Sequence, residues 1–257
     1  MYTVLGEWGF LDNLNDTSPN GRHATANFTP TYIDGPTPGT RAIRFSGSGQ
    51  TVTYGRTGLE PTTGGIVTMG WVKLFGDVFG YTDILHKTRA FDSTRHAIDV
   101  HDNSIFWMSR WRDQIQFADA GGPFGTTWHH FCNVDADDRY AWFIDGVKIF
   151  SASRAGVSAH TWENYPWVSG ANADMPSTGS DPEVAFTGLR ILQGTLSDAE
   201  VVSLMNTPIV PVTGRSGKPK VWNGSAWVPR QAKYWNGSSW INAPMLGYDG
   251  SDWILSK

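Results

Sequence analysis

The sequence predicts an all-β fold, a sandwich or barrel of short strands followed by a small C-terminal module of three hairpins. Three observations support this prediction. Short runs rich in β-branched and aromatic residues recur between positions 41 and 150, clusters of Gly, Pro and Asp separate them, and a Trp-rich motif repeats three times after position 220. The 257 residues are enough for one sandwich of about 200 residues and an appendage.

The strand candidates alternate in the manner of half-buried strands, as in the run 140–144. The candidate runs are 42–45, 50–54, 66–75, 84–86, 104–108, 128–134 and 140–144. Turn clusters such as Gly64-Gly65 and Asp145-Gly146 separate them. Because no helical pattern intervenes, the runs predict packed antiparallel sheets. We expect Trp71 and Trp142, which lie in the best-marked strands, to be largely buried.

One short helix is expected after the last strand. Ser197-Asp198-Ala199-Glu200 is a capping box, and Val201, Leu204 and Met205 form an apolar stripe behind it. Residues 208–219 are then rich in Pro, Gly and Thr and cannot pack a core of their own. The expected organisation is a sandwich domain over 1–207, a linker over 208–219 and a repeat module over 220–257.

The repeat module contains three copies of one motif. Lys220-Val221-Trp222-Asn223-Gly224-Ser225-Ala226-Trp227 recurs from Lys233, and a degenerate copy begins at Gly247. Each copy predicts a hairpin in which Asn-Gly or Asp-Gly supplies the positive φ angles of the turn. Isolated hairpins are marginally stable, so we expect the module to serve assembly. The aromatic residues assigned to that role are Trp222, Trp227, Trp235, Trp240 and Trp253.

Composition excludes several partners. The net charge of −4 is spread without a basic block, which argues against nucleic acid and favours a glycan or a protein. No apolar stretch is long enough to cross a membrane, and the N-terminus has no signal-peptide pattern. The protein is therefore expected to be made in the cytosol and to stay there or leave by lysis. Cys132, the single cysteine, is expected to be a buried, inert thiol.

The first ~205 residues resemble the laminin G-like, concanavalin A-like jelly-roll family in four segments, in the family's order. These segments are the opening turn 16–22, the core strands 42–47 and 68–73, the central hairpin 127–131 with 142–147, and the closing strand and helix 188–200. The resemblance implies a jelly-roll sandwich. Members of the family bind glycans, proteins or parts of their own polymers, so the resemblance specifies fold more than function.

Some members of this family hold a structural calcium near the opening turn. Asp16 and Asn20 are the positions that would supply oxygen ligands here, and an ordinary Asx-turn explains the same residues equally well. We therefore expect no cofactor, and a structural calcium at Asp16 and Asn20 is the alternative.

The C-terminal repeats resemble those at the ends of bacteriophage tail proteins, particularly phages of actinobacterial hosts. Together with the missing export signal, the resemblance implies a virion structural protein, a minor tail protein at the particle surface. Its partners would be other virion proteins, further copies of itself and host-surface polysaccharide. A capsid decoration protein and a stand-alone carbohydrate-binding module are the alternatives.

The sequence carries no pattern of a catalytic site, and we expect no enzyme. The paired-carboxylate strand of related glycosidases is absent, and Asp135-Ala136-Asp137-Asp138 reads as a solvated hairpin turn. His129 and His130 are adjacent on a strand and should face opposite sides. The candidates for glycan binding are Trp107, Trp111, Trp162 and Trp167, which could stack on sugar rings, with Arg110 and Arg112 as hydroxyl partners. Core packing or a subunit contact is the alternative for these aromatics.

Overall fold

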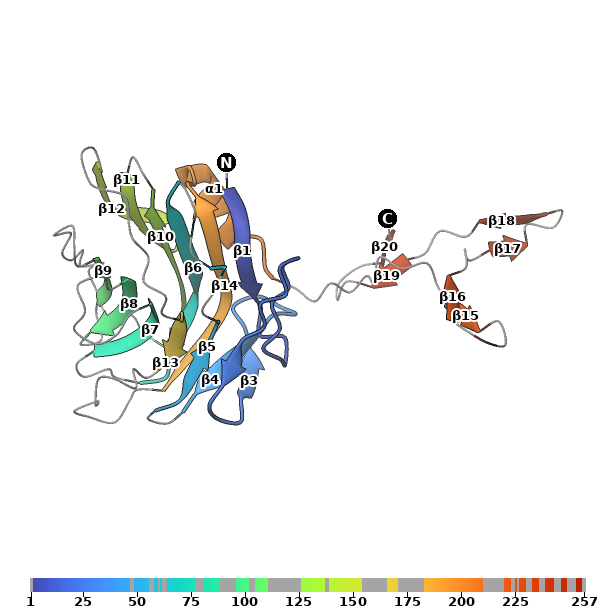
Figure 1. Ribbon diagram of the computed structural model, residues 1–257, viewed down its shortest axis with the longest axis horizontal. Helices are drawn as coiled ribbons and strands as arrows, with labels where there is room; N and C mark the ends of the chain where they lie inside the picture. Colours follow the sequence, from blue (N-terminus) through green and yellow to red (C-terminus); the bar gives the residue numbers. More distant parts are fainter. Residues whose placement is uncertain are drawn as a thin grey trace. The chain divides into compact units, whose positions relative to one another are not determined.

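The computed structural model describes most of the N-terminal part of the chain and the paired strands of the repeats. The described residues are 2–46, 49–55, 58–59, 61, 64–76, 81–87, 96–101, 105–110, 126–136, 139–153, 166–170, 183–209, 220–222, 225, 227–229, 233–235, 239–242, 246–248 and 253–255. The chain divides into two units, Met1–Ile209 and Val210–Lys257 (Figure 1).

The first unit contains two antiparallel sheets (Figure 1). The eight-stranded sheet has the order β12-β11-β10-β6-β14-β4-β3, and β1 pairs with β14. Its strands are β1 (Tyr2–Trp8), β3 (Thr31–Asp34), β4 (Arg41–Phe45), β6 (Ile66–Leu74), β10 (Trp128–Asp135), β11 (Arg139–Ile144), β12 (Val147–Ser153) and β14 (Val184–Gly194).

The six-stranded sheet has the order β2-β5-β13-β7-β8-β9. Its strands are β2 (Thr25–Ala26), β5 (Thr51–Thr53), β7 (Tyr81–Lys87), β8 (His96–His101), β9 (Ile105–Arg110) and β13 (Val168–Gly170). These strands and the single described helix of this unit confirm the all-β jelly-roll sandwich expected from the sequence.

The main core lies between the two sheets. Val72 on β6 and Phe131 on β10 contribute to it from the eight-stranded sheet, and Val52 and Leu85 contribute from the six-stranded sheet. The rings of Phe131 and Phe186 stack with centroids 5.9 Å apart. Such close packing of large apolar side chains is the main source of stability in a fold without disulfides.

A second apolar cluster covers the opposite face of the eight-stranded sheet, which we call the outer face. It includes Val67 and Met69 of β6, Cys132 of β10 and Leu192 of β14, with Val201 of helix α1 (Asp198–Met205) packed on them. The Cys132 thiol is fully buried, and burial raises its pKa, as expected for an inert cysteine. Strand β6 is thus apolar on both faces where the helix covers it.

Helix α1 begins at the capping box seen in the sequence. The hydroxyl of Ser197 accepts a hydrogen bond from the backbone N–H of Glu200, and the carboxylate of Glu200 accepts one from the backbone N–H of Ser197. The β11–β12 hairpin also has the expected turn, because Asp145 and Gly146 have φ angles of 50° and 77°. Both local signals are confirmed.

The second unit contains three separate two-stranded hairpins, as the repeats predict. Their strands are β15 (Lys220–Trp222) with β16 (Trp227–Pro229), β17 (Lys233–Trp235) with β18 (Trp240–Asn242), and β19 (Leu246–Tyr248) with β20 (Trp253–Leu255). Trp222 lies opposite Trp227, Trp235 opposite Trp240, and Tyr248 opposite Trp253. The Asn-Gly and Asp-Gly pairs of the turns lie outside the described residues.

Two burial expectations need correction. Trp142 is buried in the inter-sheet core, with 3% of its surface exposed, but Trp71 is partly exposed because it lies on the outer face beyond the apolar cluster. Asp135 is not in a solvated turn. It is the last residue of β10 and only 1% exposed, because β10 is paired on both sides to its end.

Candidate functional site

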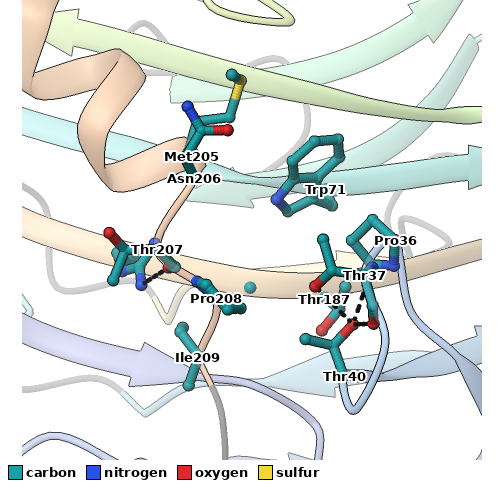
Figure 2. Close-up of a pocket in the computed structure, with 12 residues that line it drawn as sticks. Pro36, Thr37, Thr40, Trp71, Thr187, Met205, Asn206, Thr207, Pro208 and Ile209 are labelled. Carbon is teal, nitrogen blue, oxygen red and sulfur yellow. Dashed lines mark hydrogen bonds between the residues drawn. The ribbon is translucent and has the colours of Figure 1, made fainter. Parts of the chain in front are cut away.

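A small pocket opens on the outer face next to the end of helix α1. Its volume is about 120 Å³. Four separate stretches of the chain line it: the turn between β3 and β4, strand β6, strand β14, and the last residue of α1 with the segment that follows it. Figure 2 shows Met205 and Asn206 on one side of Trp71 and the turn with Pro36, Thr37 and Thr40 on the other.

Trp71 supplies the aromatic wall of the pocket. It lies on the same face of β6 as Val67 and Met69, which the helix covers, but it extends past the helix end and stays partly exposed. Its indole nitrogen is turned toward the space between the walls (Figure 2). No residue of the described part of the chain accepts a hydrogen bond from this N–H, so the group is available to a ligand.

His130 on the neighbouring strand β10 packs against the Trp71 ring. The two rings meet edge to face, with centroids 5.1 Å apart and planes at 65°. His130 is 1% exposed, and burial lowers its pKa to about 3, with a further contribution from the Arg190 charge. The supporting ring is therefore neutral at physiological pH.

A bulge in β14 forms the floor of the pocket. The register of β14 against β6 shifts between Thr187 and Arg190, which lets both residues reach the pocket although they are three positions apart. Gly188 lies inside the bulge with φ 64°, and a β-carbon there would be 3.2 Å from Cδ1 of Trp71. Glycine thus permits the bulge and leaves space for the indole.

Arg190 fixes the segment after α1 to the sheet. Its Nε donates to Oε1 of Glu7 at 2.8 Å, its Nη1 to the carbonyl oxygen of Leu204 at 2.9 Å and its Nη2 to that of Thr207 at 2.6 Å. A guanidinium at the carbonyl end of a helix satisfies unpaired carbonyls and complements the helix dipole. The role of Arg190 is therefore to position the wall formed by Met205 to Ile209.

The buried hydroxyls of the pocket are also engaged by the protein. Thr40 donates to the carbonyl oxygen of Thr37 at 2.6 Å, and the Thr187 hydroxyl lies 2.6 Å from the carbonyl oxygen of Arg41. Asn206 uses its side-chain nitrogen to donate to the carbonyl of Val202 at 3.0 Å, and this leaves its side-chain oxygen as an acceptor. A ligand would meet one aromatic face, one N–H donor and the acceptor of Asn206.

The glycan-binding residues expected from the sequence are not brought together by the described structure. Trp107 and Arg110 lie on strand β9, the last strand in the order of its sheet, and their side chains lie outside the described part of the chain. Trp111, Arg112 and Trp162 lie outside the described residues. Trp167 is a core residue, 0% exposed, with the Lys87 ammonium 5.9 Å from its ring centroid, so it cannot stack on a sugar. For Trp167 the alternative, core packing, therefore holds, because the residue is buried between the sheets.

The opening turn does not suit calcium. The carboxylate of Asp16 accepts hydrogen bonds from the backbone N–H groups of Glu7, Ser18 and Arg22 at 2.8–3.0 Å, which makes it an Asx-turn. Asn20 turns its side-chain nitrogen toward the carbonyls of Val4 and Leu5. Within the described part of the chain, no group of three or more His, Cys, Asp or Glu side chains could hold a metal ion.

A hydroxyl, an imidazole and a carboxylate form a chain at the beginning of β10. The Thr127 hydroxyl lies 3.0 Å from Nε2 of His129, and Nδ1 of His129 lies 2.8 Å from Oδ2 of Asp145. The order resembles a nucleophile, base and acid. However, Asp145 also accepts from the backbone N–H of His130 and donates its own N–H to the His130 carbonyl, both at 2.8 Å. We interpret these hydrogen bonds as a structural link that holds Asp145, which follows β11, to the beginning of β10. His129 and His130 face opposite sides of the sheet, as expected for adjacent residues of a strand.

No signal in the sequence marked the pocket. Its lining comes from residues 36–40, 71, 187–190 and 205–209, which are ordinary turn, strand and helix-end positions in sequence terms. Trp71 itself was expected in the core.

The described residues contain no helix that is long and apolar enough to cross a bilayer. Neither a protein-family model nor a curated protein matches this chain.

Solved structures do match. One is domain 4 of AbnA, a GH43 extracellular arabinanase from Geobacillus stearothermophilus, in complex with arabinotriose; the TM-score is 0.56 and the identity 20%, over 79% of this chain and 98% of that one. Another is of botulinum neurotoxin type C, whose cell entry depends on interaction with two ganglioside molecules, with TM-score 0.62 and identity 13% over 91% of this chain. This chain spans about half, 55%, of that toxin structure.

The binding domain of Paraclostridial Mosquitocidal Protein 1 is a third match, with TM-score 0.61 and identity 12% over 95% of this chain and 74% of that one. At such identities the likeness concerns fold. The chain therefore shares the β-sandwich fold of domains that bind carbohydrates or receptors.

Proposed function

We propose that this protein is a non-enzymatic glycan-binding protein of a bacteriophage particle, a minor tail protein whose sandwich is displayed at the surface. The observation that carries the binding part is Trp71, a partly exposed indole that lines the pocket and whose N–H has no acceptor among the described residues. Aromatic faces beside a few convergent polar groups are the usual means of holding a sugar. The binding domains with this fold support the same proposal.

The virion part of the proposal is supported by the C-terminal hairpins and their resemblance to repeats of phage tail proteins. Three similar hairpins in one chain offer repeated contacts to neighbouring virion subunits. A capsid decoration protein and a stand-alone carbohydrate-binding module are the alternatives. Antibody labelling of negatively stained virions tests this part: label at the tail supports it, label on the capsid favours the decoration protein, and unlabelled particles contradict a virion role.

Binding is tested with the full-length protein on host cell-wall polysaccharides and a glycan array. We expect Trp71→Ala to abolish glycan binding. We expect Thr37→Phe to abolish it as well, because the larger side chain would fill the pocket from an exposed turn and leave the core unchanged. Trp107→Ala is the matched control and should bind normally. If Trp107→Ala loses glycan binding while Trp71→Ala binds normally, the binding site lies at β9, and the assignment of binding to the pocket is contradicted.

Catalysis is tested in the same preparation. We expect no release of reducing sugar from any polysaccharide that binds. Any release would contradict the non-enzymatic part of the proposal, and its disappearance in Thr127→Ala would assign the reaction to the chain of Thr127, His129 and Asp145.

A further inference from the structure

The size of the Trp71 pocket limits what can enter it. Its volume of about 120 Å³ is somewhat below the ~150 Å³ of an apolar cavity that holds one benzene molecule. Sites that enclose a drug-sized ligand are larger, about 300–1,000 Å³. Only part of one sugar unit, a substituent with one edge of its ring, therefore fits inside, while the rest of the unit lies against the exposed part of Trp71.

The charges around the pocket exclude charged substituents. Arg190 is the one charged residue among the lining residues, and its Nε, Nη1 and Nη2 already donate to Glu7, Leu204 and Thr207. A carboxylate or phosphate would have to compete with Glu7 for a guanidinium that is only 7% exposed, and desolvating an unpaired charge is costly. No acidic residue lines the pocket, so an ammonium group would be equally unpaired.

The remaining surface of the pocket is mainly apolar. Most of the lining is carbon surface, which comes from Pro36, Trp71, Met205, Pro208 and Ile209. The buried hydroxyls of Thr40 and Thr187 donate their hydrogens to backbone carbonyl oxygens. A sugar hydroxyl pushed between these carbon surfaces would lose its water and meet few groups that could replace it, chiefly the Trp71 N–H and the Asn206 oxygen. A methyl group would gain from the same move.

Resting on the proposed glycan-binding function, we propose that the pocket takes a neutral terminal sugar that carries a methyl group, and that this methyl enters the space between Trp71 and Pro208. Two kinds of sugar present such a group, an N-acetylated sugar and a 6-deoxy sugar. The polar part of the unit then lies within reach of the Trp71 N–H and the Asn206 oxygen at the rim.

The test is an NMR titration of the full-length protein with matched monosaccharides. N-acetylglucosamine is compared with glucose, L-fucose with L-galactose, and glucuronate with glucose. We expect one methyl-bearing sugar to bind about tenfold or more tightly than its partner, the range for one apolar group in a fitted pocket. Glucuronate should bind no more tightly than glucose. The pair that shows the difference identifies the N-acetyl or the 6-deoxy class.

Variants separate this inference from the proposed function. The preference should vanish in Trp71→Ala and in Thr37→Phe but persist in Trp128→Ala, a partly exposed tryptophan on the adjacent strand that does not line the pocket. Equal binding within both methyl pairs, or tighter binding of glucuronate, overturns the inference, while Trp71-dependent binding of polysaccharide would leave the proposed function intact. The absence of any Trp71-dependent binding overturns both.

Discussion

At the residue scale, Trp142 and Trp71 differ in what covers them. Trp142 packs between the sheets with Phe150, their ring centroids 5.2 Å apart, whereas Trp71 rests on His130 and faces the pocket. Burial decides which of the two residues stabilises the fold and which is free to bind. Both are bulky aromatics in strands of one sheet, so only their surroundings separate them.

Trp142→Ala should lower the free energy of unfolding by roughly 3–5 kcal/mol, because it leaves a large cavity in the core. Trp71→Ala should lower it by clearly less, since that ring is partly solvated already. Urea unfolding of both variants and the parent checks this. Equal destabilisation by the two substitutions would contradict the assignment of Trp71 to the surface.

His130 predicts a loss of stability in mild acid. Burial, and then the charge of Arg190, lower the pKa of His130 in the folded protein from 6.5 to about 3. In mild acid the unfolded chain therefore binds a proton at this histidine and the folded protein does not. Stability is therefore complete above the unfolded pKa and falls as the pH drops from about 6.5 toward 3. Between pH 7 and pH 5 the contribution is about 2 kcal/mol.

The measurement is urea unfolding of the parent and of His130→Gln at both pH values. Because glutamine does not titrate, the variant should lose about 2 kcal/mol less than the parent over this interval. Equal decreases in the free energy of unfolding of the two proteins would mean that groups other than His130 cause the acid sensitivity.

At the element scale, α1 is too short to be helical by itself and depends on its ends. It has eight residues, and isolated helices below about 12 residues are marginal. The capping box holds its start, and Arg190 holds its final carbonyls. Because the segment 205–209 is a wall of the pocket, the stability of this helix and the shape of the binding site are coupled.

Ser197→Ala should lower stability by about 1 kcal/mol through loss of the cap. Since the same helix positions the pocket wall, glycan affinity should fall as well, by less than in Trp71→Ala. Thermal unfolding and binding titrations of one preparation test both effects, and Ser197→Asp, which retains a capping acceptor, should restore them.

The β11–β12 turn offers a second test at this scale. Gly146→Val should destabilise by about 1–2 kcal/mol, because φ is 77° there and a side chain resists that region. A β-carbon at this position would also be 3.1 Å from Cε of Met205. Gly76→Val is the control, since Gly76 is exposed, has no positive φ and has open space around it. Similar melting temperatures for the two variants would contradict the turn assignment.

At the scale of the whole molecule, the chain is two units with different kinds of stability. The sandwich has two apolar clusters, whereas the strands of each C-terminal hairpin are three residues long. Two-stranded hairpins of this length are not stable alone in water. We therefore expect them to become stable by packing on one another or on a neighbouring subunit.

Deletion of residues 220–257 should leave the melting temperature of the sandwich nearly unchanged and lower the amount of the protein in purified particles. The reason is that the deleted residues lie outside the unit Met1–Ile209, which contains both apolar clusters of the sandwich. Calorimetry of the truncated protein and immunoblots of virions are the two measurements. Full incorporation of the truncated protein would contradict an assembly role for the hairpins.

The sequence by itself determined the features that depend on near neighbours. The strand over 140–144, the Asp145-Gly146 turn, the Ser197 cap and the three hairpins are each set by residues within one turn or one strand pair, and each is present in the structure. The half-buried character expected of 140–144 is wrong, because residues 140–143 are all buried, with Trp142 in the inter-sheet core and Phe143 in the outer cluster. Local backbone sterics and side-chain period suffice for such features.

Tertiary structure alone decided the candidate site. Whether Trp71 is covered depends on where α1 ends above the outer face, and whether Trp167 is exposed depends on how the two sheets close over it. The pocket joins residues 36–40, 71, 187–190 and 205–209, and it needs the β14 bulge to turn Thr187 and Arg190 to one side. Such contacts between distant segments arise from packing of whole elements, and no pattern within a single segment records them.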